Sequence, residues 1–198
     1  SVYMTYNSTM KNLYNIETYR FTLPRDMFYT DNTGFCVPSN SCLPDGLFTM
    51  SVCEKLRTGP VEIDLPVVAS NPHFLYADQA VQASVIGLQP DDTSHLSYVD
   101  IEPMTGLIMN GSRRIQFNMK VLNDSAIKPA AHLTEMVYPM LWVSEHAEID
   151  STNAKIFHKK VIVPLRTLTT VKYVLLGIGI LMIFAMFIVL AYDRCRVR

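Results

Sequence analysis

The residue types that most often carry catalysis or metal binding are scattered along this chain. Its histidines stand singly, without an HExxH motif or a Cys/His spacing that would hold zinc, at His73, His95, His132, His146 and His158. No GxSxG motif is present to place a nucleophilic serine on a strand-to-helix turn. The sequence therefore predicts no metal site, no cofactor and no enzyme, and each histidine is expected to be a structural or surface residue.

Two carboxylates, Asp100 and Glu102, flank Ile101 and are expected on one side of a strand. If they lay close together they could form an acid–base pair. We favour another interpretation, in which they pair with Arg113 or Arg114 across a hairpin.

The cysteines and glycosylation sequons indicate an oxidising compartment. Cys36, Cys42 and Cys53 cluster in a loop rich in Pro, Asn, Ser and Gly, which suits a loop held by a disulfide. Because three is an odd number, one partner must lie elsewhere, and Cys195 is expected on the far side of a membrane. Three Asn-x-Ser/Thr sequons predict glycosylation at Asn7, Asn110 and Asn123.

An uncharged run from Tyr173 to Tyr192 predicts one transmembrane helix. Its residues, at 1.5 Å rise each, span the roughly 30 Å hydrocarbon core, and Lys172 and Arg194 close the run. Arginines in the short tail favour a cytosolic C-terminus. Everything before the helix is then expected outside the cytosol.

The residues ahead of this helix predict a β-rich domain. The clearest strand runs from Arg114 to Val121, with a buried apolar face opposite a polar face; the apolar face holds Ile115, Phe117, Met119 and Val121, and the polar face holds Gln116, Asn118 and Lys120. A strand at Tyr98 to Ile101 is expected to reach it through a turn at Pro103 to Gly106.

Three further elements are expected around this hairpin. Val61 to Ala69 reads as an edge strand or a bulge because it contains Pro66. Val137 to Val143 reads as a strand that takes the only tryptophan, Trp142, into the core. Ser151 can cap a helix that Pro164 breaks or restarts.

The charge balance of this chain argues against nucleic acid as a partner. With 17 basic and 18 acidic residues it lacks the basic stripe that nucleic-acid binding needs. The sequence begins at Ser1 without an initiator Met or signal peptide, and we expect it to be a fragment.

Several collinear strings resemble the class B scavenger receptor family, which includes fatty-acid translocases and lysosomal integral membrane proteins. The strings run almost from end to end of the chain: Phe35-Cys36, Cys42 to Gly46, NPHFLYAD at Asn71 to Asp78, Gly87 to Pro90, VDIEPMTG at Val99 to Gly106, RRIQFN at Arg113 to Asn118, and Pro139 to Trp142. The resemblance covers the C-terminal part of a family member.

This resemblance implies an α+β fold: a β-rich, irregular antiparallel barrel ectodomain, followed by one transmembrane helix. It divides the chain into ectodomain (1–160), juxtamembrane segment (161–172), transmembrane helix (173–192) and cytoplasmic tail (193–198). The barrel is expected to enclose a hydrophobic tunnel that passes fatty acids, sterols or sterol esters from bound particles to the bilayer. The receptor apex is expected upstream of Ser1, and the ligand-binding residues of this chain stay unknown.

The resemblance also implies roles for the cysteines. Cys36 and Cys42 match a family pair that forms a small loop, and Cys53 matches a cysteine bridged to one upstream of this chain. Cys195 matches tail cysteines that are palmitoylated in some members, with a free thiol as the alternative. Two departures are an insertion between Cys53 and Pro72 and a tail without a dileucine signal, which favours the cell surface.

Three functions stay open. The first is a plasma-membrane scavenger receptor with lipoprotein, lipid or soluble protein ligands, and homo-oligomerisation is compatible with it. The second is a lysosomal membrane protein that binds and traffics a soluble enzyme. The third is a membrane-tethered hydrolase, which no motif in the sequence supports.

Overall fold

The computed structural model describes residues 2–11, 14–31, 42–49, 55–58, 61–64, 66–123 and 134–196. They form two compact units, Ser1–Glu148 and Ile149–Arg198. The first unit holds the β-structure and the second is helical.

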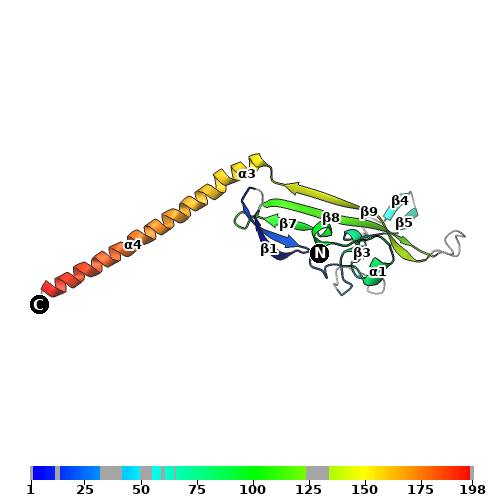
Figure 1. The fold of residues 1–198 in the computed structure, drawn as a ribbon, viewed down its shortest axis with the longest axis horizontal. Coiled ribbons are helices and arrows are strands. Elements are labelled where there is room, and N and C mark those ends of the chain that lie inside the picture. The colour runs from blue at the N-terminus through cyan, green and yellow to red at the C-terminus, as the bar shows by residue number, and fades with distance from the viewer. Residues whose placement is uncertain are drawn as a thin grey trace. The chain divides into compact units, whose positions relative to one another are not determined.

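One curled antiparallel sheet of seven strands forms the first unit, and β8 and β9 are its longest members (Figure 1). The strands are β1 (Thr5–Lys11), β2 (Glu17–Thr22), β3 (Leu47–Thr49), β6 (Val67–Ser70), β7 (Tyr98–Ile101), β8 (Ile108–Val121) and β9 (Met136–Glu148). Their order is β1-β2-β7-β8-β6-β3, and β9 also pairs with β8. A separate hairpin consists of β4 (Lys55–Thr58) and β5 (Val61–Asp64). This curled half-barrel confirms the predicted β-rich fold.

The predicted hairpin is present, since β7 pairs antiparallel with β8. The segment around Pro66 differs from the prediction. It holds two strands, because β5 pairs with β4 whereas β6 lies between β3 and β8. The prediction of an edge strand is therefore wrong for β6, and Pro66 lies just before that strand, where its missing N–H disrupts no ladder bond.

The alternation along β8 was predicted correctly, but its buried face was not. Gln116 and Asn118 are 2% and 0% exposed, whereas Met119 is 37% exposed. The polar side chains are buried because they are hydrogen-bonded: Gln116 Nε2 donates to Asn118 Oδ1 at 2.7 Å, and Asn118 Nδ2 donates to Ser70 Oγ at 3.0 Å. The backbone N–H of His73 completes the network by donating to Gln116 Oε1.

Short helices follow β6 in the sequence: η1 (Pro72–Phe74), α1 (Gln79–Ala83) and α2 (Asp92–His95). The chain around η1 is strained, because His73, Phe74 and Tyr76 all have positive φ. Phe74 is fully buried and packs with Leu47 and Val81. A second core cluster packs residues that follow β2 and α2 against the segment after η1. It contains Leu23, Met27, Phe28, Leu75 and Leu96.

One glycine is required by close packing in this region. Gly46 has φ +82°, and a Cβ there would lie 2.3 Å from Ala77 Cα. The backbone N–H of Gly46 donates to the Phe28 carbonyl, and Asp78 N–H donates to the Asp45 carbonyl. The segment after Cys42 is thereby tied to the segment that precedes α1.

The second unit contains α3 (Ser151–Phe157), a π-helical turn (His158–Ile162) and α4 (Val163–Arg196). The N-cap of α3 is Asp150, whose Oδ1 accepts from the N–H groups of Thr152 and Asn153. The predicted cap at Ser151 is therefore wrong by one residue. Pro164 follows the π-helical turn as the second residue of α4, inside the continuous helical stretch Ser151–Ile188. The prediction that Pro164 breaks the helix is therefore wrong, and the irregularity takes the form of the π-helical turn just before it.

The predicted span Tyr173 to Tyr192 lies within α4. The helical stretch Ser151–Ile188 has a mean hydropathy of 2.4 in its most apolar window, and none of that window is buried in the structure. The domain boundaries predicted at 160, 172 and 192 stay predictions.

Candidate functional site

An apolar cavity of about 490 Å³ is the candidate ligand site. Most of its wall is aliphatic or aromatic, and it is lined by Val2, Met4, Leu23, Phe28, Phe48, Ser70, Asn71, Ser97, Arg113, Arg114, Ile115 and Phe117. The rings of Phe28 and Phe48 stack with centroids 4.4 Å apart. This volume lies within the roughly 300–1,000 Å³ range of small-molecule sites.

The cavity lies where the hydrogen-bond ladder along β8 is interrupted. Ser112 pairs with Tyr98 at the end of β7, and Gln116 pairs with Ser70 at the end of β6. The β8 residues between these two pairings, 113–115, have no partner in β7 or β6, and all three line the cavity. Because β8 changes its partner from β7 to β6 at this point, there is room for a ligand beside the β8 backbone.

One hydroxyl satisfies the β8 backbone at this interruption. Ser97 Oγ accepts from the Arg114 N–H at 2.9 Å and lies 3.1 Å from the Arg114 carbonyl, to which it donates. The Arg114 guanidinium is held in turn by the carbonyls of Thr93 and Leu96, at 3.0 and 2.8 Å. No backbone donor or acceptor of Arg114 is therefore left unpaired beside the apolar wall.

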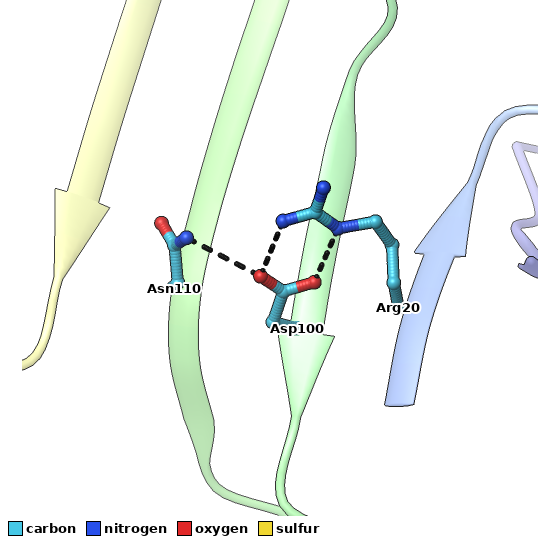
Figure 2. A network of polar contacts seen from close by, with 3 residues as sticks. All are labelled: Arg20, Asp100 and Asn110. Atoms are coloured by element: carbon cyan, nitrogen blue, oxygen red, sulfur yellow. Dashed lines mark hydrogen bonds and ion pairs between the residues drawn. The ribbon is translucent and has the colours of Figure 1, made fainter. Parts of the chain in front are cut away.

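Both carboxylates flanking Ile101 have structural partners, but not the predicted ones. Asp100 accepts from Arg20 Nε and Nη2, both at 2.7 Å, and from Asn110 Nδ2 at 3.2 Å (Figure 2). Glu102 accepts from Thr105 N and Oγ1 within the turn. The bidentate bond to Asp100 raises the pKa of the Arg20 guanidinium above its ordinary value.

The arginines expected to pair with these carboxylates have other partners. Arg113 forms an exposed ion pair with Glu145 at 2.7 Å, and Arg114 binds the two carbonyls described above. The prediction was wrong because it considered only neighbours across the hairpin. Arg20 lies on β2, the strand on the other side of β7.

Two of the scattered histidines are brought together. The rings of His73 and His95 stack with centroids 4.2 Å apart, and Trp142 contacts His95 edge-on at 5.9 Å. Each Nδ1 accepts a backbone N–H, from Gln89 at 3.1 Å for His73 and from Asp91 at 3.0 Å for His95. Burial, together with the nearby His73, lowers the pKa of His95.

Trp142 lies on β9 but does not enter the core as predicted. It is 42% exposed, and most of β9 is exposed as well. Among the described residues, no group of three or more His, Cys, Asp or Glu could hold a metal ion. His132 lies outside the described residues, and His146 and His158 lie on β9 and in the π-helical turn.

The predicted modification sites differ in their exposure. Asn7 and Asn123 are exposed, whereas Asn110 is half-buried, with Nδ2 bonded to Asp100. Cys42 is disulfide-bonded, but Cys36 and Cys53 lie outside the described residues, so the pairing stays a prediction. Cys195 lies in the last turns of α4.

The cavity itself could not be identified from the sequence. Its residues come from six separate stretches of the chain, and no motif joins them. Two of the strings quoted above do contribute to its wall: NPHFLYAD provides Asn71, and RRIQFN provides Arg113, Arg114, Ile115 and Phe117.

Comparison with known proteins shows similarity over nearly the whole chain. Residues 1–190 match the model of the CD36 family. The chain is 29% identical to lysosome membrane protein 2 of Rattus norvegicus over 182 residues, which is 91% of this chain and 36% of that protein. It is 31% identical over 187 residues to scavenger receptor class B member 1 of Cricetulus griseus, covering 91% of this chain and 34% of that receptor.

A third similarity is to sensory neuron membrane protein 2 of Anopheles gambiae, at 33% identity over 160 residues, covering 81% of this chain and 26% of that protein. The chain thus spans about a third of the length of the curated relatives it matches.

Proposed function

Because this chain belongs to the CD36 family, we propose that it is part of a membrane receptor that binds lipoprotein or lipid ligands and passes fatty acids, sterols or sterol esters to the bilayer. The apolar cavity beside residues 113–115 is the observation that supports this most. An extended apolar helix in the same chain provides the candidate span.

The chemistry of transfer is non-covalent. Each CH₂ group kept out of water contributes about 0.8 kcal/mol, so an apolar route lowers the cost of moving an acyl chain or sterol between a particle and the bilayer. The stacked rings of Phe28 and Phe48 offer a flat apolar wall, and no bond of the lipid has to break. The proposal therefore assigns no catalytic residue.

Filling the cavity tests this proposal. In the complete protein at the cell surface, Ile115→Trp places a larger ring into the cavity and is expected to reduce uptake of a labelled sterol ester about fivefold, the effect of roughly 1 kcal/mol. Leu107→Trp is the matched control, because Leu107 is exposed in the turn before β8 and does not line the cavity. Surface delivery of each variant is measured to normalise uptake.

The ester recovered from the cells separates transfer from hydrolysis. Intact ester in the membrane fraction is expected, whereas free sterol formed by the purified protein would contradict a purely non-covalent role. Equal uptake by both tryptophan variants would remove the cavity from the transfer route.

We propose the plasma membrane as the location. The similarity to lysosome membrane protein 2 supports the second candidate, a lysosomal membrane protein that binds and traffics a soluble enzyme. Surface labelling of intact cells favours the receptor, whereas lysosomal residence with a co-purifying soluble enzyme would favour the alternative.

The proposed topology places the tail, residues 193–198, in the cytosol and the sheet outside it. We propose glycans at Asn7, Asn110 and Asn123, which this topology allows. The family resemblance further suggests a Cys36–Cys42 disulfide, a bridge from Cys53 to a cysteine upstream, and acylation of Cys195, each on the side of the membrane that its chemistry requires. A tag placed ahead of Lys172 should be accessible from outside intact cells. A tag that becomes accessible only after the plasma membrane is permeabilised, and that lies in no organelle lumen, would overturn it.

A further inference from the structure

Asn7 lies at an irregularity of the outermost strand of the sheet. In the pairing of β1 with β2, Tyr6 faces Phe21 and the next pair is Ser8 with Arg20, so Asn7 is an extra residue in a β-bulge. Bulges redirect a side chain and interrupt pairing at a sheet edge. Asn7 is exposed, and β1 is the terminal strand in the sheet order.

A polar cleft of about 480 Å³ begins at this bulge. Its lining combines hydroxyl, charged and aromatic side chains, and consists of Thr5, Asn7, Arg20, Thr22, Leu23, Pro24, Arg25, Tyr76, Asp92, Thr93, Leu96 and Tyr98. The bulge thus places the nitrogen acceptor of a sequon on the rim of a cleft. The apolar cavity has a different lining and shares only Leu23 with it.

The lining of the polar cleft suits a carbohydrate. Sugar hydroxyls need donors and acceptors, which the threonines, Arg25 and Asp92 can provide, and apolar sugar faces pack on aromatic rings. Arg25 and Asp92 are exposed and lie 3.7 Å apart, a loose pair that contributes little to stability and can turn toward a ligand. Tyr76 and Tyr98 each lie beneath a guanidinium, from Arg25 and Arg20, at 4.9 and 4.2 Å.

We propose that the glycan on Asn7 folds back into the polar cleft, with its first N-acetylglucosamine units held there. The attachment is the ordinary one for a sequon: Asn7 Nδ2 bonds to C1 of the sugar, the C1–O bond to the lipid diphosphate donor breaks, the lipid diphosphate leaves, and the amide gives up one proton.

This inference rests on the proposed placement of the sheet outside the cytosol. A glycan found at another sequon together with an unmodified Asn7 would overturn the inference and leave that placement intact. A protein without glycan at any sequon would overturn both.

The test measures how well the native fold protects the Asn7 glycan. The complete protein is produced in cells that make only high-mannose glycans and is treated, while folded, with an endoglycosidase that cuts between the first two N-acetylglucosamine units. Mass spectrometry of the Asn7 peptide then gives the cleavage rate. Arg25→Ala is expected to raise this rate about tenfold, the effect of losing one hydrogen bond to a charged group.

Asp26→Ala is the matched control, because Asp26 is exposed, adjacent in sequence and absent from the cleft lining. It should leave the cleavage rate unchanged. Equal cleavage rates in the wild type and Arg25→Ala would overturn the proposal, and so would an equal increase in both variants.

Discussion

Replacing Arg20 by methionine is expected to destabilise the sheet, because it leaves the Asp100 carboxylate buried without its cation. Asp100 is 3% exposed and receives two bonds of 2.7 Å from the Arg20 guanidinium (Figure 2). Removing one partner of a buried ion pair costs about 3–5 kcal/mol. Since the Arg20 side chain is 26% exposed and partly hydrated, we expect the loss near the lower end, about 3 kcal/mol.

The ion pair between Arg113 and Glu145 provides the control. Its N–O distance is also 2.7 Å, but its side chains are 75% and 61% exposed. Exposed pairs contribute about 0–1 kcal/mol, so Arg113→Met should change stability little. The two substitutions therefore differ in burial and not in the length of the ion pair they remove.

The assay is proteolysis of the complete protein in increasing urea, which yields the free energy of unfolding for the β-rich domain. The double variant Arg20→Met/Asp100→Leu should recover more than half of the loss, because neither charge is then left buried alone. Similar losses for Arg20→Met and Arg113→Met, or a double variant as unstable as the sum of its single changes, would refute this reasoning.

Three further predictions concern pH, close packing and a helix cap. The pKa of His95 is lowered in the folded state, chiefly by burial, so below about pH 6.5 the unfolded chain binds more protons than the folded chain. The free energy of unfolding should therefore be highest above that pH and fall on acidification. His95→Phe should reduce this pH dependence when unfolding is measured from about pH 7.5 to 5. Gly46→Ala should destabilise by at least about 2 kcal/mol, from its positive φ and the contact with Ala77, whereas Gly106→Ala, with nothing within 4 Å, should lose only about 1 kcal/mol in the same urea assay. Asp150→Ala should lower the stability of α3 by about 1 kcal/mol, whereas Ser151→Ala should change it very little. Hydrogen exchange of the α3 backbone amides would detect this difference. Equal exchange rates in the two variants would show that Asp150 is not the N-cap.

Local patterns in the sequence predicted the elements whose causes are local. The uncharged run in α4 and the alternation and turn that form β7 and β8 could be read directly, because each depends on residues close in sequence. The same local patterns did not predict the ion-pair partner of the buried carboxylate. Asp100 pairs with Arg20, which lies 80 positions away, and no hairpin argument contains that residue.

The sequence also predicted the wrong buried face for β8, and the reason is physical. Ile115 and Phe117 were expected in the core because apolar faces are usually buried, but they line the apolar cavity. Gln116 and Asn118 are buried instead, since their amides bond each other, Ser70 and the η1 backbone. Alternation identifies two faces of a strand, whereas only the tertiary contacts decide which of them is covered.

The hydroxyl of Ser97 has a mechanical consequence for the sheet. One edge of residues 113–115 pairs with β9, but on the other edge the Arg114 backbone bonds to the Ser97 hydroxyl in place of a strand, at 2.9 and 3.1 Å. Breaking these two hydrogen bonds costs roughly 1–3 kcal/mol, and the bonds from the Arg114 guanidinium to the Thr93 and Leu96 carbonyls would have to break as well before β8 could part from this region. At this edge β8 is therefore held by the side chains of Ser97 and Arg114 rather than by a continuous backbone ladder.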